Sequence, residues 1–546
     1  MKDIAVLKWI FKNCGKRGKE IVALVLLNAL NAGSATMFAM TSKSVMDCAQ
    51  NGSREEVYKN CGFLLILILT QLFTRIFSSL VHAKSQGKAE ISLKSTVFSR
   101  LIYGKYAEST EKHSGDLMTR LTSDVTMVSE QYVNLLPRIV STLVRLVTAV
   151  IALYSIDKRF FGLFFICAII VPLAATVTRK YIKKIHRRLC EKEAIVRSFM
   201  QEMIENLFAV KVFGIEEKVL GISLKQQKSL YREKVKRVAV SVLTRNMFSF
   251  AFSLAYLIAV VYGSYGVLEG TITFGSIVAI IQLVSQLRAP TTGITSVSTA
   301  FYGMITSAQR LMEVSGTENE KKEYPEMDYN EFIKIRVEDA TFGYRDETVI
   351  NKANFTINKG EFIGIKGPSG AGKSTLFKLI TGLYPLDSGS AVVETTKGDI
   401  DCKYAKRIFS FVPQDNMLFS GTIRENITML NPDATQSEIE AALKNAAAEF
   451  VFDLDEGLDF VLGESGMGVS QGQAQRLAIA RALLGKGKIL LMDEATSALD
   501  SETEKRIMEN LRKAGDVTVL FITHREMVVE QCDRTITVCD KQISEN

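Results

Sequence analysis

The segment 367–375 limits the possible folds of this chain more than any other stretch. Its residues are Gly367, Pro368, Ser369, Gly370, Ala371, Gly372, Lys373, Ser374 and Thr375. An apolar run at 362–365 precedes it and predicts a buried strand, and the run at 376–380 that follows predicts a helix. A glycine loop between strand and helix lets successive backbone N–H groups point at phosphate oxygens. We therefore predict a nucleotide site in which Lys373 reaches the β and γ phosphates and Ser374 ligates Mg²⁺.

Composition indicates a chain divided between an apolar region and a charged one. Its 546 residues are too many for one domain. Apolar residues make up 47% of the chain and charged residues 23%, with a mean hydropathy of +0.13. Such averages are typical of a chain whose apolar residues are concentrated in one part. The net charge of +8 lies beside those apolar stretches, which favours a lipid bilayer as partner and argues against a nucleic acid.

Six apolar stretches in the first three hundred residues are candidate membrane spans. Helices of about 20 residues cross the roughly 30 Å of hydrocarbon in a bilayer. The candidates lie at about 21–40, 63–80, 135–154, 160–178, 247–264 and 274–287, and the last two have less distinct ends. We therefore predict an all-α, six-helix transmembrane domain at 1–311. A charged linker with one proline follows at 312–331, and a second domain occupies 332–546.

The charges of the connections orient these spans. Residues 1–20 carry six basic and two acidic residues, a net of +4, and residues 178–192 carry seven and one, a net of +6. Residues 81–112 carry six and three, a net of +3, whereas 41–60 balances three against three. Because cytoplasmic loops are enriched in basic residues, we expect the N-terminus, 81–134, 179–246 and the second domain in the cytoplasm. The two long cytoplasmic segments have a helical pattern that is interrupted at 113–125 and at 211–216. We expect these two stretches to form compact tips of the segments, suited to docking on another domain.

Polar residues inside the predicted spans occur in pairs that share one helical face. The pairs are Asn28 with Asn31, Gln71 with Arg75, Arg138 with Arg145, and Gln282 with Gln286. Charged groups at membrane depth usually face the bundle interior or water, so Arg75 and Arg145 are candidates for a cavity lining. The alternative is that the arginines reach the membrane surface or pair with other groups. Cys48 and Cys61 fall in one predicted external connection and could form a disulfide.

The domain at 332–546 alternates short strands with helices, as an α/β nucleotide-binding domain does. The apolar run 489–492 ends in Asp493 and Glu494. One carboxylate there can hold Mg²⁺ while the other orients an attacking water. A further strand at 517–523 ends in His524, whose imidazole could meet a γ-phosphate. Tyr344 precedes the glycine loop and is a candidate to stack on adenine, although a single aromatic residue is more often part of a core.

Several motifs resemble those of the ATP-binding cassette (ABC) proteins. The string Val469-Ser470-Gln471-Gly472-Gln473-Ala474-Gln475-Arg476 resembles the signature motif, and Phe411-Val412-Pro413-Gln414 resembles the Q-loop. Residues 491–500, LMDEATSALD, resemble the Walker B motif and D-loop, and residues 418–427, LFSGTIRENI, are similar to a stretch typical of exporters. Residues 113–125 resemble the first coupling-helix region of six-span exporters. The resemblance thus covers nearly the whole chain, as a half-transporter with an α/β P-loop NTPase domain after its membrane domain.

The resemblance implies a role for each matching residue. Tyr344 would stack on adenine, the loop 367–375 would hold the phosphates, and Ser374, Gln414 and Asp493 would hold Mg²⁺. Glu494 would act as general base and His524 as the switch residue, with Gln414 coupling the site to the membrane helices. Ser470 and Gly472, with Gln473 beside them, would contact ATP bound to the opposite subunit. Gln471 and Val469 depart from the commonest signature, which has glycine and leucine there, and this leaves open how well the chain completes its partner's site.

One phosphate loop and one signature in the chain imply that the family's two-ATP sandwich needs two chains. We predict a homodimer, with a heterodimer of two half-transporters as the alternative. The implied function is ATP-driven export of a small molecule, lipid or peptide across a bacterial inner membrane by alternating access. The alternatives are a nucleotide-gated channel or regulatory subunit of the same fold, and a siderophore-type importer with exporter architecture.

Overall fold

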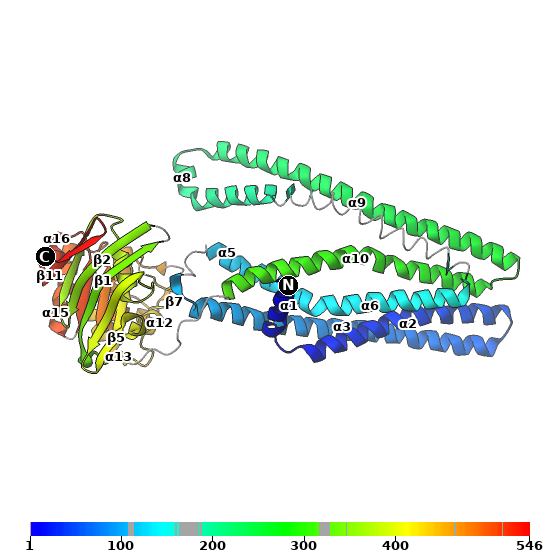
Figure 1. Cartoon of the computed structure of the whole chain (residues 1–546), viewed down its shortest axis with the longest axis horizontal. Helices are drawn as coiled ribbons and strands as arrows, with labels where there is room; N and C mark the ends of the chain where they lie inside the picture. Colours follow the sequence, from blue (N-terminus) through cyan, green and yellow to red (C-terminus); the bar gives the residue numbers. More distant parts are fainter. Residues whose placement is uncertain are drawn as a thin grey trace. The chain divides into compact units, whose positions relative to one another are not determined.

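The computed structural model describes residues 2–107, 114–158, 161–162, 185, 188–189, 191–315, 328–344, 347–415, 417–463, 466–515 and 517–545. The chain divides into two compact units. Unit 1 comprises Met1–Ile102 and His113–Gly316, and unit 2 comprises Tyr103–Lys112 and Thr317–Asn546. The described part of unit 1 is helical, and the described strands belong to unit 2 (Figure 1). This division confirms the predicted fold class, a helical membrane domain followed by an α/β domain.

The helices of unit 1 include several that are much longer than the average helix of a soluble protein. They are α1 (Lys2–Asn13), α2 (Gly18–Gln50), α3 (Arg54–Tyr103), α5 (Ser114–Thr119), the π-helix η1 (Arg120–Asp124), α6 (Val125–Ile156), α8 (Leu207–Val212), α9 (Glu216–Leu268) and α10 (Phe274–Ser315). Residues 191–205 are also helical. At 1.5 Å per residue, the 50 residues of α3 extend about 75 Å, far more than a bilayer core requires.

Among the described residues, three helices are long and apolar enough to cross a membrane. They lie at Gly18–Gln50, Arg54–Tyr103 and Gly115–Ile156, and they contain the predicted spans 21–40, 63–80 and 135–154. Shorter apolar helical stretches at Ser253–Leu268 and Phe274–Gln286 overlap the predicted spans 247–264 and 274–287. The predicted span 160–178 lies almost wholly outside the described residues.

The connection between the first two spans is shorter than the sequence pattern predicted. Helix α2 continues to Gln50 and α3 begins at Arg54, so only residues 51–53 join them. Cys48 and Cys61 therefore lie on the two helices rather than in an external loop, and both are free thiols. The sequence pattern predicted a short external connection, and the structure makes it shorter still, because the charged and polar residues at 41–50 and 54–62 continue the two helices.

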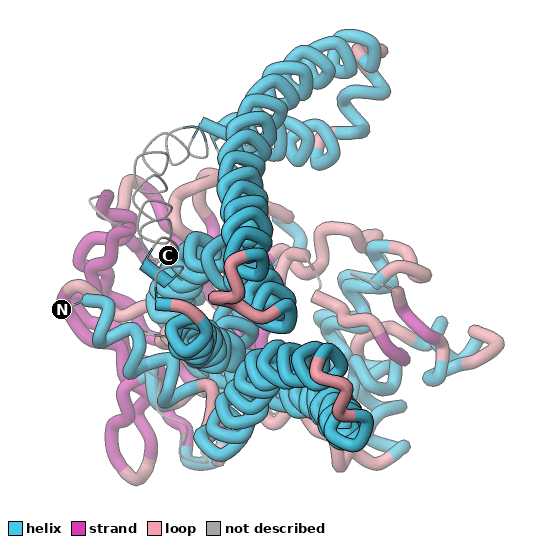
Figure 2. Tube along the Cα trace, turned by 90° about the vertical axis from the view of Figure 1, so that its right-hand side faces the viewer, coloured by secondary structure: helices cyan, strands magenta, loops and turns pink. Residues whose placement is uncertain are grey.

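Helices α2, α6 and α10 pack against one another and form the core of unit 1. A buried cluster between these helices and α9 contains Ala39, Ala149, Ala259, Ile280 and Leu283. Small residues at such contacts allow apolar helices to approach closely. Figure 2 views the long helices nearly end on and shows them side by side. Helix α9 meets α10 near its C-terminal end, where Gly263 lies against Ile277, and diverges from the bundle toward α8 (Figure 1).

The predicted interruption at 113–125 is a short helix followed by a π-helical turn, and His113 itself lies outside the described residues. Arg120 is 9% exposed and donates to Asp116 (2.7 Å) and to Glu313 on α10 (3.1 Å). Asp124 pairs with Arg310 at 2.9 Å. The second predicted interruption, 211–216, contains the end of α8 and a tight turn in which Gly214 has a φ of 61°.

Two sheets form the framework of unit 2. A four-stranded antiparallel sheet has the order β2-β1-β4-β5, and a six-stranded sheet has the order β12-β11-β3-β10-β9-β6. The strands of the first are β1 (Phe332–Tyr344), β2 (Glu347–Asn358), β4 (Ser388–Thr395) and β5 (Gly398–Asp401). Those of the second are β3 (Phe362–Lys366), β6 (Phe409–Val412), β9 (Ile489–Asp493), β10 (Thr518–Ile522), β11 (Arg534–Cys539) and β12 (Gln542–Glu545). A small pair, β7 (Gly421–Thr422) and β8 (Val461–Leu462), is separate.

The helices of unit 2 bury the apolar strands of the larger sheet. They are α11 (Lys373–Ile380), α12 (Ile423–Thr428), α13 (Gln436–Asn445), α14 (Gln471–Leu484), α15 (Ser501–Ala514) and α16 (Glu526–Glu530). Short 3-10 turns lie at Tyr329–Glu331, Cys402–Tyr404, Lys406–Ile408, Glu449–Asp453 and Gly457–Asp459. Every residue of β9 and β10 is buried, as expected for parallel strands covered on both faces. Because β3, β6, β9 and β10 are parallel, their carboxyl ends lie along one edge of the sheet.

Candidate functional site

The glycine loop joins β3 to α11 at this edge. Its glycines have backbone conformations that other residues adopt rarely, with φ values of 152° at Gly367, 80° at Gly370 and 101° at Gly372. Lys373 is 7% exposed, and its Nζ donates to the carbonyl oxygens of Gly367 and Pro368, each at 2.9 Å. Ser374 is exposed on the first turn of α11. The loop thus has the strand–loop–helix context that the sequence predicted.

Asp493 ends β9 and lies close to the same loop. Its side chain is largely buried, and this burial raises the pKa of the Asp493 carboxyl above its ordinary value. A hydrogen bond from the Ser374 hydroxyl and the positive charge of Lys373 oppose that rise. Asp493 and Ser374 therefore place a carboxylate and a hydroxyl next to each other, both of which are oxygen ligands of the kind that Mg²⁺ prefers.

The structure brings three predicted site residues from three different strands into contact. Gln414 follows β6, Glu494 follows β9, and His524 follows β10. The Nε2 of Gln414 donates to Oε2 of Glu494 at 3.0 Å, and Nε2 of His524 lies 3.7 Å from Oε1 of Glu494. The two carboxylate oxygens of Glu494 thus face Gln414 and His524 respectively. Glu494 also has a φ of 48°, a left-handed conformation that is uncommon for a residue with a side chain.

Tyr344 lies at the end of β1 in a group of aromatic rings. Its ring meets those of Phe342 and Tyr384 edge to face, at centroid distances of 4.9 and 5.5 Å. Its hydroxyl lies 3.4 Å from Oγ1 of Thr375, which connects it to the glycine loop. With 38% of its surface exposed, Tyr344 has a free face beside the loop rather than a place in the core.

Ser470, Gly472 and Gln473 belong to the start of α14. Ser470 is the N-cap of this helix, and its Oγ accepts from the backbone N–H of Gln473 at 3.2 Å. The Gln473 side chain accepts in return from the N–H of Ser470 at 2.8 Å, which completes a capping box. Gly472 lies against the turn 497–499, where a Cβ would stand 3.0 Å from the carbonyl oxygen of Ala498. Among the described residues, no hydrogen bond connects these three residues with the glycine loop.

Sequence reasoning missed two residues that contact the turn after Glu494. Gln475 on α14 hydrogen-bonds Ser497 and the N–H of Ala498, and Arg525 donates to the carbonyls of Ser497 and Leu499. Gln475 lies inside the signature string, and Arg525 directly follows His524. The position of each residue in or next to a motif was the signal in the sequence that could have identified it. The contacts themselves depend on how α14 and β10 pack and could not be predicted locally.

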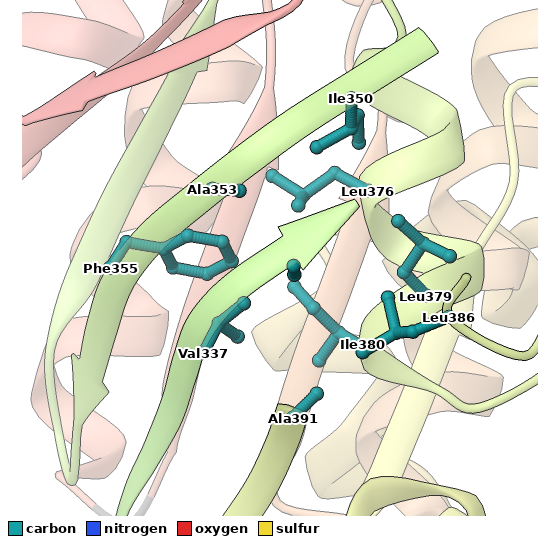
Figure 3. A pocket seen from close by; sticks show the side chains of 10 residues that line it. Val337, Ile350, Ala353, Phe355, Leu376, Leu379, Ile380, Leu386 and Ala391 are labelled. Carbon is teal, nitrogen blue, oxygen red and sulfur yellow. The ribbon is translucent and has the colours of Figure 1, made fainter. Parts of the chain in front are cut away.

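An enclosed hollow in unit 2 is part of the core and not a binding site. It lies between the four-stranded sheet and α11, where Val337, Phe355, Leu376, Ile380 and Ala391 point toward one another (Figure 3). Its free volume is about 10 Å³ and its lining is apolar. A space of this size is at the lower limit for one water, and nothing polar there would hold one.

Polar residues of the membrane helices mostly make contacts between helices. Asn28 donates to Ser78 at 3.1 Å, and Asn31 donates to Thr74 at 3.0 Å and to the carbonyl of Gln71 at 3.2 Å. Gln286 donates to the carbonyl of Ala35 at 2.9 Å. These contacts join α2 to α3 and to α10, so these side chains stabilise the bundle.

Arg75 and Arg145 differ from the other polar residues of the spans. Arg145 is half-buried on α6, and the positive charge of Arg75 on α3 acts on it. No ion pair connects either arginine with a carboxylate in the described ranges, which leave out most of 159–190.

Comparison with known proteins identifies the class to which this fold and site belong. Residues 21–291 match the family described as the ABC transporter transmembrane region, and residues 350–497 match the family described as ABC transporter. The chain belongs to the ABC transporter family. It is an exporter-type half-transporter, since one chain holds one membrane domain and one nucleotide-binding domain, and its ATP hydrolysis is coupled to transport.

Relatives share this organisation along almost their whole length. A putative export ATP-binding/permease protein of Rickettsia conorii is 27% identical, with 99% of this chain and 95% of that protein covered. An ATP-dependent lipid A-core flippase of Vibrio cholerae is also 27% identical, with 98% and 93% covered. A solved structure of a bacterial Atm1-family ABC exporter with ATP bound has the same fold, with a TM-score of 0.82, 22% identity, and 97% and 95% coverage. The predicted family and the predicted ATPase class are confirmed, and the chain is an integral membrane protein that binds ATP.

Proposed function

We propose that this protein exports an amphipathic cargo by alternating access, and that Glu494, Gln414 and His524 carry the ATP hydrolysis. The observation that supports this most directly is the convergence of these three side chains, from three strands, beside the glycine loop. Phosphoryl transfer to water depends mostly on positioning and charge stabilisation, so a site of this kind is built from groups held in fixed relation.

Each residue has a proposed role that its surroundings support. Tyr344 stacks on adenine with its exposed face, and the backbone of 367–375 and Lys373 bind the phosphates. Glu494 accepts a proton from the attacking water, and the Gln414 hydrogen bond orients its carboxylate. We propose that the His524 imidazole contacts the γ-phosphate, and its position 3.7 Å from Glu494 supports this.

The oxygen donors of the site fit Mg²⁺. Ser374 and Asp493 are already joined by a hydrogen bond, and Gln414 lies on the neighbouring strand end. No group of three His, Cys, Asp or Glu side chains suited to a metal occurs in the described part of the chain. The carboxylate of Asp493 and the hydroxyl of Ser374 suit Mg²⁺, which proteins often hold through one or two carboxylates together with the phosphates of the nucleotide. The ion would neutralise phosphate charge during the reaction.

We propose further that the working unit is a homodimer. In the described residues, Ser470, Gly472 and Gln473 make no hydrogen bond to the glycine loop of their own chain, which suits contact with ATP on a second chain. The tip at α8 supports the same conclusion, because Phe208 and Phe213 are 82% and 71% exposed. Apolar side chains this exposed at a cytoplasmic tip are suited to docking on another domain. A heterodimer with another half-transporter is the alternative.

The cargo that best suits the membrane domain carries negative charge. Arg75 and Arg145 are two cations at membrane depth that lack a carboxylate partner among the described residues. Arg145 is half-buried and Arg75 is exposed on the surface of the helices. A charge at membrane depth is costly unless an anion or water is near it. An amphipathic anion would supply that partner during transport, and the relative named a lipid A-core flippase favours a lipid among the candidate classes.

We propose the direction and the location from the charge pattern and from the relatives. The basic segments support a cytoplasmic nucleotide-binding domain in a bacterial inner membrane, and relatives named for export support outward transport. Passive ion conductance upon ATP binding would instead support a nucleotide-gated channel, and inward accumulation would support a siderophore-type importer.

The test is ATPase activity of the full chain in lipid vesicles, beside Glu494→Gln, with anionic lipids, neutral drug-like compounds and peptides added. We expect basal turnover, its loss in Glu494→Gln, and stimulation by an anionic lipid. We expect the double variant Arg75→Ala/Arg145→Ala to keep basal turnover and lose the stimulation. Unchanged stimulation in the double variant would remove the anionic-cargo proposal and leave the ATPase proposal standing.

A further inference from the structure

The side chain of Arg525 contacts the turn that follows Glu494. Arg525 comes directly after His524, and its guanidinium is a planar fork with several donors. Nη2 donates to the carbonyl oxygen of Ser497 at 2.8 Å, and Nη1 donates to that of Leu499 at 2.9 Å. One side chain thus bonds two carbonyls of a single turn. It connects the segment that holds His524 with the segment that holds Glu494.

A buried carboxylate orients this guanidinium. Glu504, on the first turn of α15, is 1% exposed, and its Oε2 accepts from Nη1 of Arg525 at 3.0 Å. Its Oε1 has no hydrogen-bond partner in the described residues. A buried carboxylate is unfavourable unless it is paired, so apolar packing alone would not favour glutamate here. The pairing with Arg525 is the contact that explains its position.

The same turn is held from its other side by Gln475. This residue is completely buried on α14, and its Nε2 lies 3.1 Å from Oγ of Ser497. Its Oε1 accepts from the N–H of Ala498 at 3.0 Å. The turn 497–499 is therefore fixed between the helix that begins at the signature motif and the side chain that follows His524.

The conformation of Glu494 explains why such support matters. Its φ of 48° is unfavourable for a residue with a Cβ and persists only when its surroundings hold it. Two backbone contacts help, since the N–H of Glu494 donates to Ile522 at 3.0 Å and its carbonyl accepts from Ser497 at 3.1 Å. The second of these contacts involves the residue whose own carbonyl Arg525 binds. Loss of the Arg525 contacts would therefore leave Gln475 alone to hold the turn next to Glu494.

We propose that Arg525, oriented by Glu504, is a positioning residue for ATP hydrolysis. It holds the turn 497–499 so that Glu494 keeps its left-handed conformation opposite His524. This inference rests on the proposed function, in which Glu494 and His524 carry hydrolysis. In the described part of the chain, no hydrogen bond or ion pair joins Arg525 to Tyr344 or to Lys373. We therefore expect its loss to slow the chemical step more than it weakens nucleotide binding to the same chain.

The test compares Arg525→Lys and Arg525→Ala with the wild type, using the full chain in lipid vesicles and Mg-ATP as substrate. Lysine keeps the positive charge beside Glu504, so the buried carboxylate stays paired, but its single ammonium cannot bond two carbonyls like the fork. We expect kcat per bound nucleotide to fall about tenfold to a hundredfold in both variants, as small displacements of catalytic groups do. We expect the KM for Mg-ATP to stay within about twofold of wild type. The number of fluorescent ATP analogues bound per chain should stay within about twofold of wild type as well.

The matched control is Arg506→Ala, which removes an arginine from the exposed side of α15, where it pairs with Glu449. We expect wild-type kcat for this variant. A purely structural role for Arg525 would lower the stoichiometry of bound nucleotide and leave kcat per bound nucleotide unchanged, and that result would overturn the proposal. Wild-type kcat in both Arg525 variants would overturn it as well. Glu494→Gln separates the two proposals, since full turnover in that variant contradicts the proposed function itself.

Discussion

Replacing Gly367 with alanine tests whether the glycine loop depends on backbone conformation or only on its charges. Gly367 has a φ of 152°, and an added Cβ would stand 3.1 Å from the carbonyl carbon of Val538 and closer still to its oxygen. Val538 belongs to β11, which pairs with β3 directly before the loop. Relief of the overlap therefore requires the ends of two paired strands to separate.

Gly370→Ala is the matched control, because Gly370 also has a positive φ, of 80°, yet an added Cβ there meets nothing within 4 Å. Both variants bear the cost of a positive φ, about 1–3 kcal/mol. Gly367→Ala in addition disturbs at least one backbone hydrogen bond between β3 and β11, which costs about 1–3 kcal/mol. The expected difference between the two variants corresponds to roughly 2–12 °C in unfolding midpoint for a domain of this size.

The assay follows unfolding of the nucleotide-binding domain in the full chain without nucleotide. Cys402 is 1% exposed, so its alkylation during heating reports when this domain opens. We expect Gly367→Ala to expose Cys402 at a clearly lower temperature than Gly370→Ala. Equal midpoints for the two variants would contradict the reasoning, because they would show that the overlap with Val538 is relieved at no cost.

Two further predictions concern a helix cap and buried thiols. Ser470→Ala removes the cap of α14 and lowers the unfolding free energy by about 0.5–2 kcal/mol, whereas Ser470→Thr keeps the cap. Urea denaturation measures the unfolding free energy of both variants. An equal loss of unfolding free energy in the two variants would refute the capping role. Burial raises the pKa of the Cys402 thiol to about 12 from the ordinary 9.0. The folded state therefore favours the protonated thiol, and the stability that this gives is complete below pH 9 and is lost as the pH rises from 9 to 12. Alkylation in the folded protein at pH 8 therefore reaches the exposed Cys539 and not Cys402, and the alkaline loss of stability is smaller in Cys402→Ala.

The parts of the fold that the sequence predicted correctly are those with a strong local pattern. Apolar runs predicted helices that cover 21–40, 63–80 and 135–154, because a bilayer requires about 20 apolar residues in a row. The ends of these helices were not predictable in the same way. Residues 41–50 and 54–62 are polar and charged but continue α2 and α3, since nothing in them interrupts a helix once it leaves the hydrocarbon.

Within the nucleotide site, local pattern predicted the single residues but not their contacts. Asp493, Glu494 and His524 follow apolar strands, which was visible in the sequence. That Gln414 and His524 both lie beside Glu494 depends on the order β3-β10-β9-β6, which differs from the order along the chain. Strand order results from how helices cover the sheet and how crossovers close, and no local sequence pattern specifies it.

The sequence by itself determined the family, the two kinds of domain and the glycine loop, because these depend on short-range spacing and on hydrophobic length. Only the tertiary structure decided which side chains meet, such as Gln475 and Arg525 at the turn 497–499 and Glu504 behind Arg525. A buried carboxylate can occur at position 504 only because a residue twenty-one places later in the chain supplies its counter-charge. Such pairings depend on packing between distant segments, where the low polarity of the interior makes each unpaired charge costly.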